Sequence, residues 1–219
     1  MAGKRGELDG STAGNGMNGN GGRMEGLEVT TCQRCPALVE TRSQIVNGVG
    51  PVDADLLIVG EAPGADEDRQ GEPFVGRSGK LLDEKLATAG IDRASIRITN
   101  CIRCRPPDNR DPLGEELAHC NEWLLNEIDT VDPAVIMAVG KVPAEHLLQR
   151  SVAVTKEAGS IESVHLGEVP RTVIVSVHPA AMLYDPSQEE NLESTLEVVA
   201  RQLGISPPSD PQTGLGDFE

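Results

Sequence analysis

The chain has 219 residues, enough for one compact domain with a substantial core, and its 35 acidic against 19 basic residues give a net charge of −16. Only five of the basic residues are lysines and 2% of all residues are aromatic, a composition typical of proteins from a high-salt cytoplasm. The acidity argues against a broad nucleic-acid-binding surface, so any such contact has to be local.

The ends of the chain differ in composition from its middle. Residues 1–25 are rich in Gly, Asn and Ser, and residues 206–219 are similarly polar, so we expect two disordered tails around one domain spanning 26–205. No stretch has the ~18 consecutive apolar residues of a membrane span, and the N-terminus lacks a signal-peptide core. These features predict a cytoplasmic protein that binds no membrane.

The middle of the chain alternates between two patterns. Runs rich in β-branched residues predict buried strands at 55–60, 95–102, 134–140 and 172–177. Apolar residues at helical spacing predict helices at 78–90, 113–128, 142–150 and 188–204. Residues 160–171 predict an extra edge strand and a turn. This alternation predicts an α/β fold, a three-layer αβα sandwich around a central parallel sheet of about four strands.

Three unusual segments follow predicted strands. They are GEAPGADEDRQGEPFVG (60–76) after the first strand, NCIRCRPPDNRDP (100–112) at and after the second, and HPAAML (178–183) after the fourth. Ligands of such sheets bind beyond the carboxyl ends of the strands. The sequence therefore predicts a ligand site where these three segments meet.

The five cysteines indicate a second kind of site, because thiols in the cytoplasm stay reduced and disulfides are not expected. Cys32 and Cys35 form one C-x-x-C pair, Cys101 and Cys104 form another, and Cys120 lies in a predicted helix. Three interpretations fit these spacings: a zinc site made by the two pairs, an iron–sulfur cluster that leaves out Cys101, or thiols that are simply buried.

The three segments, in this order, resemble the iron–sulfur family of uracil-DNA glycosylases, often called family 4, and the resemblance covers residues 32 to about 203. It implies a monomeric DNA-repair enzyme that flips uracil out of single- or double-stranded DNA and hydrolyses it from the sugar, leaving an abasic site. It also implies a 4Fe–4S cluster whose ligands fall on Cys32, Cys35, Cys104 and Cys120.

The chemistry of uracil excision assigns expected roles to the catalytic residues. The base must leave the helix, and the negative charge that develops on it must be stabilised. His178 is expected to donate a hydrogen bond to uracil O2 as that charge develops. Glu61 is expected to orient or deprotonate water and to stabilise the cationic sugar.

Other residues of the same segments are expected to bind the base itself. Phe74 is expected to cover its face, with core packing under the loop as the alternative. Asn100 is expected to read its O4 and N3–H edge, with a capping or turn asparagine as the alternative. Ala62 and Pro63 are expected to line the pocket through their backbone. Asp68 is a further candidate for substrate contact, with a solvated acidic loop or a partner for a helix dipole as the alternative interpretation.

Two groups of residues are expected to meet the DNA. Residues 97–110 contain four arginines and one aspartate, which is a local excess of positive charge in an acidic chain. The phosphate-binding candidates are Arg77, Lys80, Arg103, Arg105 and Arg110. Met182 and Leu183 are expected to act as apolar wedges that fill the space left by the flipped base, with packing at a helix start as the alternative.

Overall fold

The computed structural model describes residues 17–18, 21–167 and 169–205. The expectations about 1–16 and 206–219 fall outside these residues. The expected disorder of residues 1–25 needs a correction at its end, because Gly22–Glu25 forms strand β2. Its ladder with β3 (Glu28–Cys32) supplies the backbone hydrogen bonds that composition alone did not reveal.

The central sheet has five strands in the order β5-β4-β6-β8-β7. They are β4 (Leu56–Gly60), β5 (Arg97–Asn100), β6 (Val135–Val139), β7 (Ile161–Leu166) and β8 (Val169–Ser176). The first four in the sheet order are parallel, and β7 is antiparallel to β8 at the edge. The predicted parallel sheet and its extra edge strand are thus confirmed.

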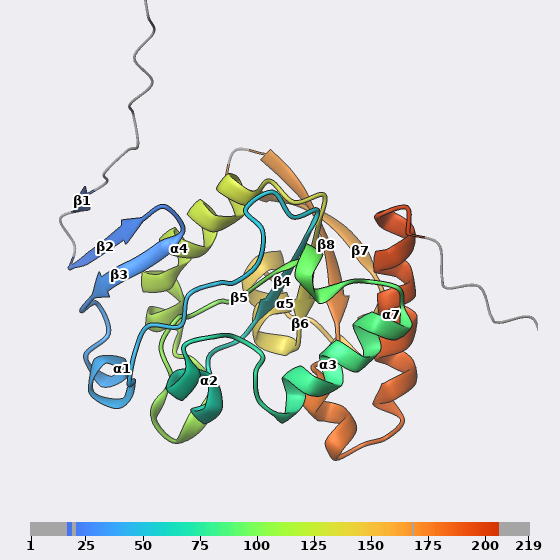
Figure 1. The fold of residues 1–219 in the computed structure, drawn as a ribbon, viewed down its shortest axis with the longest axis horizontal. Coiled ribbons are helices and arrows are strands. Elements are labelled where there is room, and N and C mark those ends of the chain that lie inside the picture. Colours follow the sequence, from blue (N-terminus) through green and yellow to red (C-terminus); the bar gives the residue numbers. More distant parts are fainter. Residues whose placement is uncertain (1–16, 19–20, 168, 206–219) are drawn as a thin grey trace, which may run out of the picture.

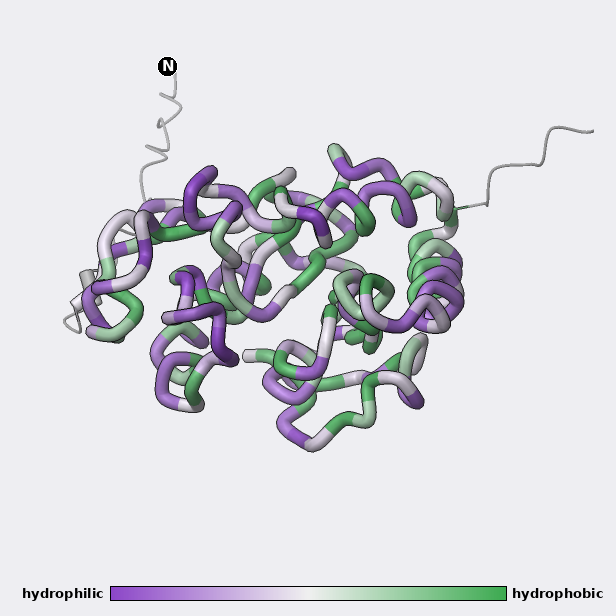
Figure 2. Tube along the Cα trace, turned by 90° about the horizontal axis from the view of Figure 1, so that it is seen from below, coloured by the Kyte–Doolittle hydropathy of each residue, from purple (hydrophilic) through white to green (hydrophobic). Residues whose placement is uncertain are grey.

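Helices cover both faces of this sheet, as the sandwich prediction requires (Figure 1). One face packs against α3 (Arg77–Thr88) and α7 (Gln188–Gln202), and the other against α4 (Gly114–Val131) and α5 (Lys141–Leu148). Hydrophilic and hydrophobic residues alternate along the turns of α7 in Figure 2, the pattern of a helix with one buried side. The described helices include none that is long and apolar enough to cross a membrane.

Strand β4 lies between β5, the next strand along the chain, and β6. The chain therefore leaves β4 toward one side of the sheet and later returns on its other side. In parallel α/β sheets this topological switch point is where ligands bind, beyond the carboxyl ends of the strands. The fold thus predicts a ligand site near Gly60, the last residue of β4.

A third apolar cluster lies outside the main sandwich and was not expected from the sequence. Strands β2 and β3 form a small antiparallel sheet with β1 (Met17–Asn18), and Figure 1 shows β2 and β3 beside α4. Trp123 of α4 packs in this cluster with Met24, Val29 and Leu38. Leu38 comes from α1 (Pro36–Thr41), the helix that follows the first C-x-x-C pair.

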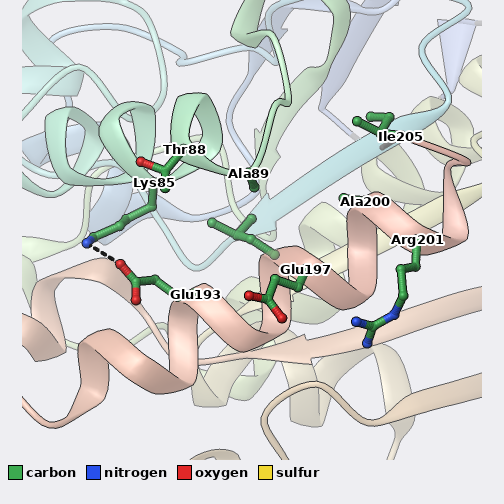
Figure 3. Close-up of a pocket in the computed structure, with 9 residues that line it drawn as sticks. Lys85, Thr88, Ala89, Glu193, Glu197, Ala200, Arg201 and Ile205 are labelled. Carbon is green, nitrogen blue, oxygen red and sulfur yellow. Dashed lines mark hydrogen bonds and ion pairs between the residues drawn. The ribbon is translucent and has the colours of Figure 1, made fainter. Parts of the chain in front are cut away.

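Short helical turns complete the chain: α2 (Ala65–Gln70), α6 (Val154–Glu157), η1 (Arg93–Ser95), η2 (Pro107–Asn109) and η3 (Pro179–Leu183). A groove of about 450 Å³ runs between α3 and α7, where Lys85 binds Glu193 across the two helices at 2.6 Å (Figure 3). Its lining residues come from the last turn of α3, from α7 and from the segment that follows α7, so the groove is separate from the carboxyl ends of the strands.

Candidate active site

Phe74, Asn100 and His178, which come from the three segments singled out in the sequence, meet beside the end of β4. The ring centroids of Phe74 and His178 are 5.8 Å apart, with 31° between the ring planes. A Cβ added to Gly60 would lie 2.3 Å from Oδ1 of Asn100 and 2.6 Å from Cε2 of Phe74. Only glycine at position 60 therefore lets the amide and the aromatic ring approach the strand end together.

Asn100 ends β5 and is 4% exposed. Its side-chain Nδ2 is buried and has no hydrogen-bond partner among the described residues. Leaving a buried donor unpaired costs about 1–3 kcal/mol, so such groups call for an explanation. A ligand that accepts a hydrogen bond at this position provides one.

His178 caps the start of η3 and is held in one orientation by the backbone. The N–H of Ala180 donates to its Nδ1 at 3.1 Å, so in the neutral ring the proton is on Nε2. Burial lowers the pKa of His178 to about 4. The imidazole is therefore neutral at physiological pH, and Nε2–H is the group it offers as a donor.

Glu67 of α2 is a site residue that the sequence analysis did not select. Its carboxylate accepts the N–H of Phe74 at 2.5 Å and the N–H of Gly64 at 2.6 Å. Phe74 has a φ of 55°, a left-handed conformation that costs energy for a bulky residue. Glu67 thus holds the aromatic ring in a strained backbone position. A carboxylate one helical turn after an N-cap glycine was the only signal for it in the sequence.

Gly79 in α3 allows the same loop to fold tightly. A Cβ at this position would lie 1.8 Å from the carbonyl oxygen of Phe74, so no larger residue fits without moving the loop. The start of α3 and the Phe74 backbone are therefore in direct contact. Phe74 is thus held by Glu67, which precedes it in the chain, and by Gly79, which follows it.

Glu61 directly follows β4 and is half-buried. Burial, and to a smaller extent the negative charge of Asp111, raises the pKa of Glu61 to about 7. Its backbone carbonyl accepts the N–H of Ile102 at 3.2 Å, which ties it to the segment after β5. Of the next two residues, Ala62 is half-buried and Pro63 is buried. Glu61 is thus a carboxyl group that can take up or release a proton near neutral pH.

Asp68 does not have the expected role in substrate contact. Its side chain is 3% exposed, and both carboxylate oxygens accept the N–H of Ser43 at 2.9 Å. Gln44 donates to its backbone carbonyl. Asp68 therefore fixes the loop after α1, because a buried carboxylate needs such donors. The sequence could not show which acids of the loop point inward.

The basic residues expected to bind DNA differ in their exposure and in their partners. Arg77 and Lys80, in the first turn of α3, are exposed and form no ion pair within the described part of the chain. Arg105 is half-buried and donates to Asn109 at 2.7 Å. Arg110 is partly exposed but makes a two-pronged ion pair with Glu116, at 2.6 and 2.8 Å.

Arg103 cannot bind phosphates in this structure, contrary to expectation, because it is 2% exposed. Its guanidinium binds the fully buried Glu127 at 2.8 Å and also donates to the backbone carbonyl of Leu27. Arg97 binds the other oxygen of Glu127 at 2.5 Å. Two arginines of the basic run therefore neutralise one internal carboxylate, and a charge count cannot distinguish them from exposed ones.

The two wedge candidates lie side by side in η3 but differ in their packing. Met182 is half-buried and packs against the core cluster shared by the sheet, α3 and α7. Leu183 is also half-buried. Tyr184, which follows them, is 89% exposed. Packing of the helical turn thus accounts for Met182, which leaves Leu183 as the better wedge candidate.

Four of the five cysteines belong to the third apolar cluster. Cys32, Cys104 and Cys120 are buried within it, and the half-buried Cys35 packs against it. Cys101 is buried in a different cluster, between the sheet, α4 and α5. Cys101 thus packs in another apolar cluster than the other four thiols, which come from β3, the N-cap of α1, the loop after β5, and α4.

The environment of these thiols disfavours their free ionisation. Burial, and then the proximity of Cys32 and Cys104, raises the pKa of Cys35 to about 11, and burial raises the pKa of Cys120 to about 12. Within the described ranges, no group of three or more His, Cys, Asp or Glu side chains is arranged to hold a metal ion.

The fold and the site define an α/β protein with four polar or aromatic groups at the switch point of a parallel sheet: an aromatic ring, a buried amide, a neutral imidazole and a carboxyl group. The model of the uracil DNA glycosylase superfamily matches residues 47–201.

Several proteins similar in sequence to this chain are named as particular types of uracil-DNA glycosylase. A type-4 uracil-DNA glycosylase of Archaeoglobus fulgidus is 38% identical over 186 residues, which cover 83% of this chain and 93% of that protein. A type-4 uracil-DNA glycosylase of Thermotoga maritima is 40% identical, with 74% and 82% covered. A type-5 enzyme of Pyrobaculum aerophilum is 29% identical, with 79% and 88% covered. The chain belongs to the uracil DNA glycosylase superfamily and, within it, to the type-4 family.

Proposed function

We propose that the protein excises uracil from DNA by hydrolysing the N-glycosidic bond, as the first step of base excision repair. The observation that carries this proposal is the buried, unpartnered Nδ2 of Asn100 beside the Phe74 ring and the imidazole of His178. An amide with one free donor complements a base that presents a carbonyl next to an N–H, as uracil does at O4 and N3.

Recognition of the flipped base is assigned to Phe74 and Asn100. Phe74 is proposed to stack on the base, although its ring is 4% exposed and packs in the core cluster shared by the sheet, α3 and α7, and Asn100 is proposed to read the base edge. Cytosine presents a donor where uracil presents O4, so the Nδ2 group would face another donor. The hydrogen bonds from Phe74 and Gly64 to Glu67 keep the ring in place before the base arrives. Ala62 and Pro63 line the same strand end through their backbone.

Stabilisation of the departing base is assigned to His178. The Ala180 N–H fixes its tautomer, and burial keeps the ring neutral, so Nε2–H can donate to uracil O2 as negative charge develops there. A donor that is already oriented costs no reorganisation at the transition state, which is why such groups contribute strongly to catalysis. His178 needs no proton transfer for this role.

Activation of water is assigned to Glu61. In its ionised form the carboxylate can orient or deprotonate the attacking water, and its charge stabilises the cation-like sugar. Because the pKa of Glu61 is raised to about 7, the ionised form is a stronger base than an ordinary glutamate. Exposed Arg77 and Lys80 beside Phe74 are proposed to hold the DNA phosphates, with Arg105 and Arg110 as a second group.

The four thiols of the third cluster are proposed to bind a 4Fe–4S cluster. Cys32, Cys35, Cys104 and Cys120 would hold the cluster through their thiolates, which is supported by their common place in the third apolar cluster. When bound, the cluster would tie β3, α4 and the loop after β5 together. We also propose that the enzyme acts as a monomer, and that its acidic composition reflects a high-salt cytoplasm.

A single-turnover assay on an oligonucleotide with one uracil tests the activity, with the thymine-containing oligonucleotide as the control. Wild-type protein should convert only the first to an abasic, alkali-labile product. His178→Ala should lower the rate on the order of a hundred- to a thousandfold with little change in DNA affinity. A wild-type rate for His178→Ala would contradict the assigned chemistry, and no cleavage by the wild type would contradict the activity.

A further inference from the structure

From the contacts of Arg42 with two of the proposed ligand residues, we infer that Arg42 is a positioning residue for the iron–sulfur cluster, which it would stabilise while tuning its reduction potential. This inference rests on the proposed 4Fe–4S cluster. It adds to the four thiols a fifth side chain that would bind no iron itself.

Arg42 contacts two distant parts of the chain at once. Its Nη1 donates to Sγ of Cys104 at 2.9 Å, and its Nη2 donates to the backbone carbonyl of Cys32 at 2.6 Å. Its own backbone N–H caps α1 by donating to Leu38. One guanidinium thus connects the loop after β5 to the end of β3 across the third apolar cluster.

No carboxylate among the described residues is paired with the positive charge of Arg42. Arg42 forms no ion pair with an acidic side chain among the described residues, whereas nearby Arg103 is paired with the buried Glu127. The guanidinium is half-buried beside the apolar cluster, so an opposite charge close to it would be favourable. The thiolate that Cys104 becomes as an iron ligand would supply it.

Two effects follow from this arrangement. An N–H···S hydrogen bond withdraws electron density from the sulfur, and the adjacent positive charge favours the more negative, reduced state of the cluster, so both raise its reduction potential. The bridge from Cys104 to the Cys32 carbonyl also restricts the separation of ligands from β3 and the loop after β5. Removal of the side chain should therefore lower the potential and speed the loss of iron.

The test compares Arg42→Met and Arg42→Lys with the wild type and with Arg201→Met, which removes an exposed arginine of α7. The measurements are the rate of iron loss in a chelator, followed by visible absorbance, and the midpoint potential without DNA. For Arg42→Met we expect iron loss on the order of ten- to a hundredfold faster and a lower potential. Arg42→Lys keeps the positive charge but cannot bond both Cys104 and Cys32 as the guanidinium does. Its reduction potential should therefore stay nearer the wild-type value, while iron loss should still be faster.

The outcomes separate this inference from the proposal on which it rests. Wild-type protein without iron would overturn the cluster itself. Wild-type protein with iron, together with an unchanged iron-loss rate and potential in Arg42→Met, would overturn the role of Arg42. If Arg42→Met fails to fold by circular dichroism, Arg42→Lys decides: iron loss at the wild-type rate in that variant overturns the bridging role, and faster loss supports it.

Discussion

Gly60 and Asn100 face each other at the ends of two adjacent parallel strands, so closely that a Cβ on Gly60 would lie 2.3 Å from Oδ1 of Asn100. The same Cβ would lie 2.6 Å from the Phe74 ring. The parallel pairing of β4 and β5 therefore builds the site. Because Gly60 has no side chain, there is room for the Asn100 amide and for the Phe74 ring, which the loop after β4 brings back to the strand end.

Gly60→Ala should impair uracil excision strongly, because the added methyl group must displace Asn100 or Phe74. Overpacking of this kind costs roughly 1–3 kcal/mol of stability and moves the groups that bind the base. Gly64→Ala is the matched control, since its Cβ would have Glu67 Oε2 as nearest neighbour at 3.5 Å, an ordinary contact. Single-turnover rates and melting temperatures of both variants check this. Equal activity of the two would contradict the packing argument.

Glu67→Gln should lower activity through Phe74, although Glu67 is not assigned a contact with the substrate. An amide has one oxygen, so it can satisfy only one of the two N–H groups from Gly64 and Phe74 that the carboxylate accepts. The unpaired donor should cost about 1–3 kcal/mol of stability. Exposed Glu72→Gln serves as the control. A loss confined to KM would indicate base binding, and an unchanged enzyme would show that the ring needs no such support.

The rate of excision should depend on pH through Glu61. With its pKa at about 7, the ionised form decreases about tenfold for each pH unit below that value, so single-turnover rates should fall on the acid side of pH 7. His178, with a pKa of about 4, stays neutral above pH 5 and adds no second limb there. Glu61→Gln should be slow and independent of pH between 5 and 8. A wild-type rate that is flat over this range would exclude Glu61 as the base.

The stability of the same variant provides an independent check on the pKa of Glu61. The folded-state pKa lies above the unfolded value of 4.5, so the folded protein binds the proton more tightly. This favours folding below about pH 4.5 and is lost as the pH rises to about 7. The free energy of unfolding of Glu61→Gln minus that of the wild type should therefore be more positive at pH 8 than at pH 4. Denaturant unfolding at the two pH values measures this difference.

The sequence predicted the sandwich well because its signals are local. Four β-branched runs and the helical periodicity between them are properties of short windows, and parallel topology follows from their alternation. The small sheet of β1, β2 and β3 was missed for the complementary reason. Gly22–Glu25 is short and polar, and it becomes a strand only by pairing with β3 and by covering Trp123.

The sequence predicted the site segments but not the direction of every side chain in them. Strand order brings Phe74, Asn100 and His178 together, so their position after strands was enough to select them. Asp68 and Arg103 lie in the same kind of polar run, yet both point inward to buried partners. Those partners, the Ser43 N–H and Glu127, are distant in the chain, which is why composition alone gave the wrong roles.

The last prediction concerns η3, where apolar side chains follow His178. A wedge fills the space left by a flipped base only when a stack exists, so Leu183→Ala should lower excision from duplex DNA more than from single strands. Exposed Tyr184 can stack on bases of either substrate, so Tyr184→Ala should weaken binding to both. Met182→Ala should instead lower the melting temperature, because Met182 packs against the core. Affinity and single-turnover rates on the two substrates separate these effects, and equal losses on both for Leu183→Ala would contradict the wedge.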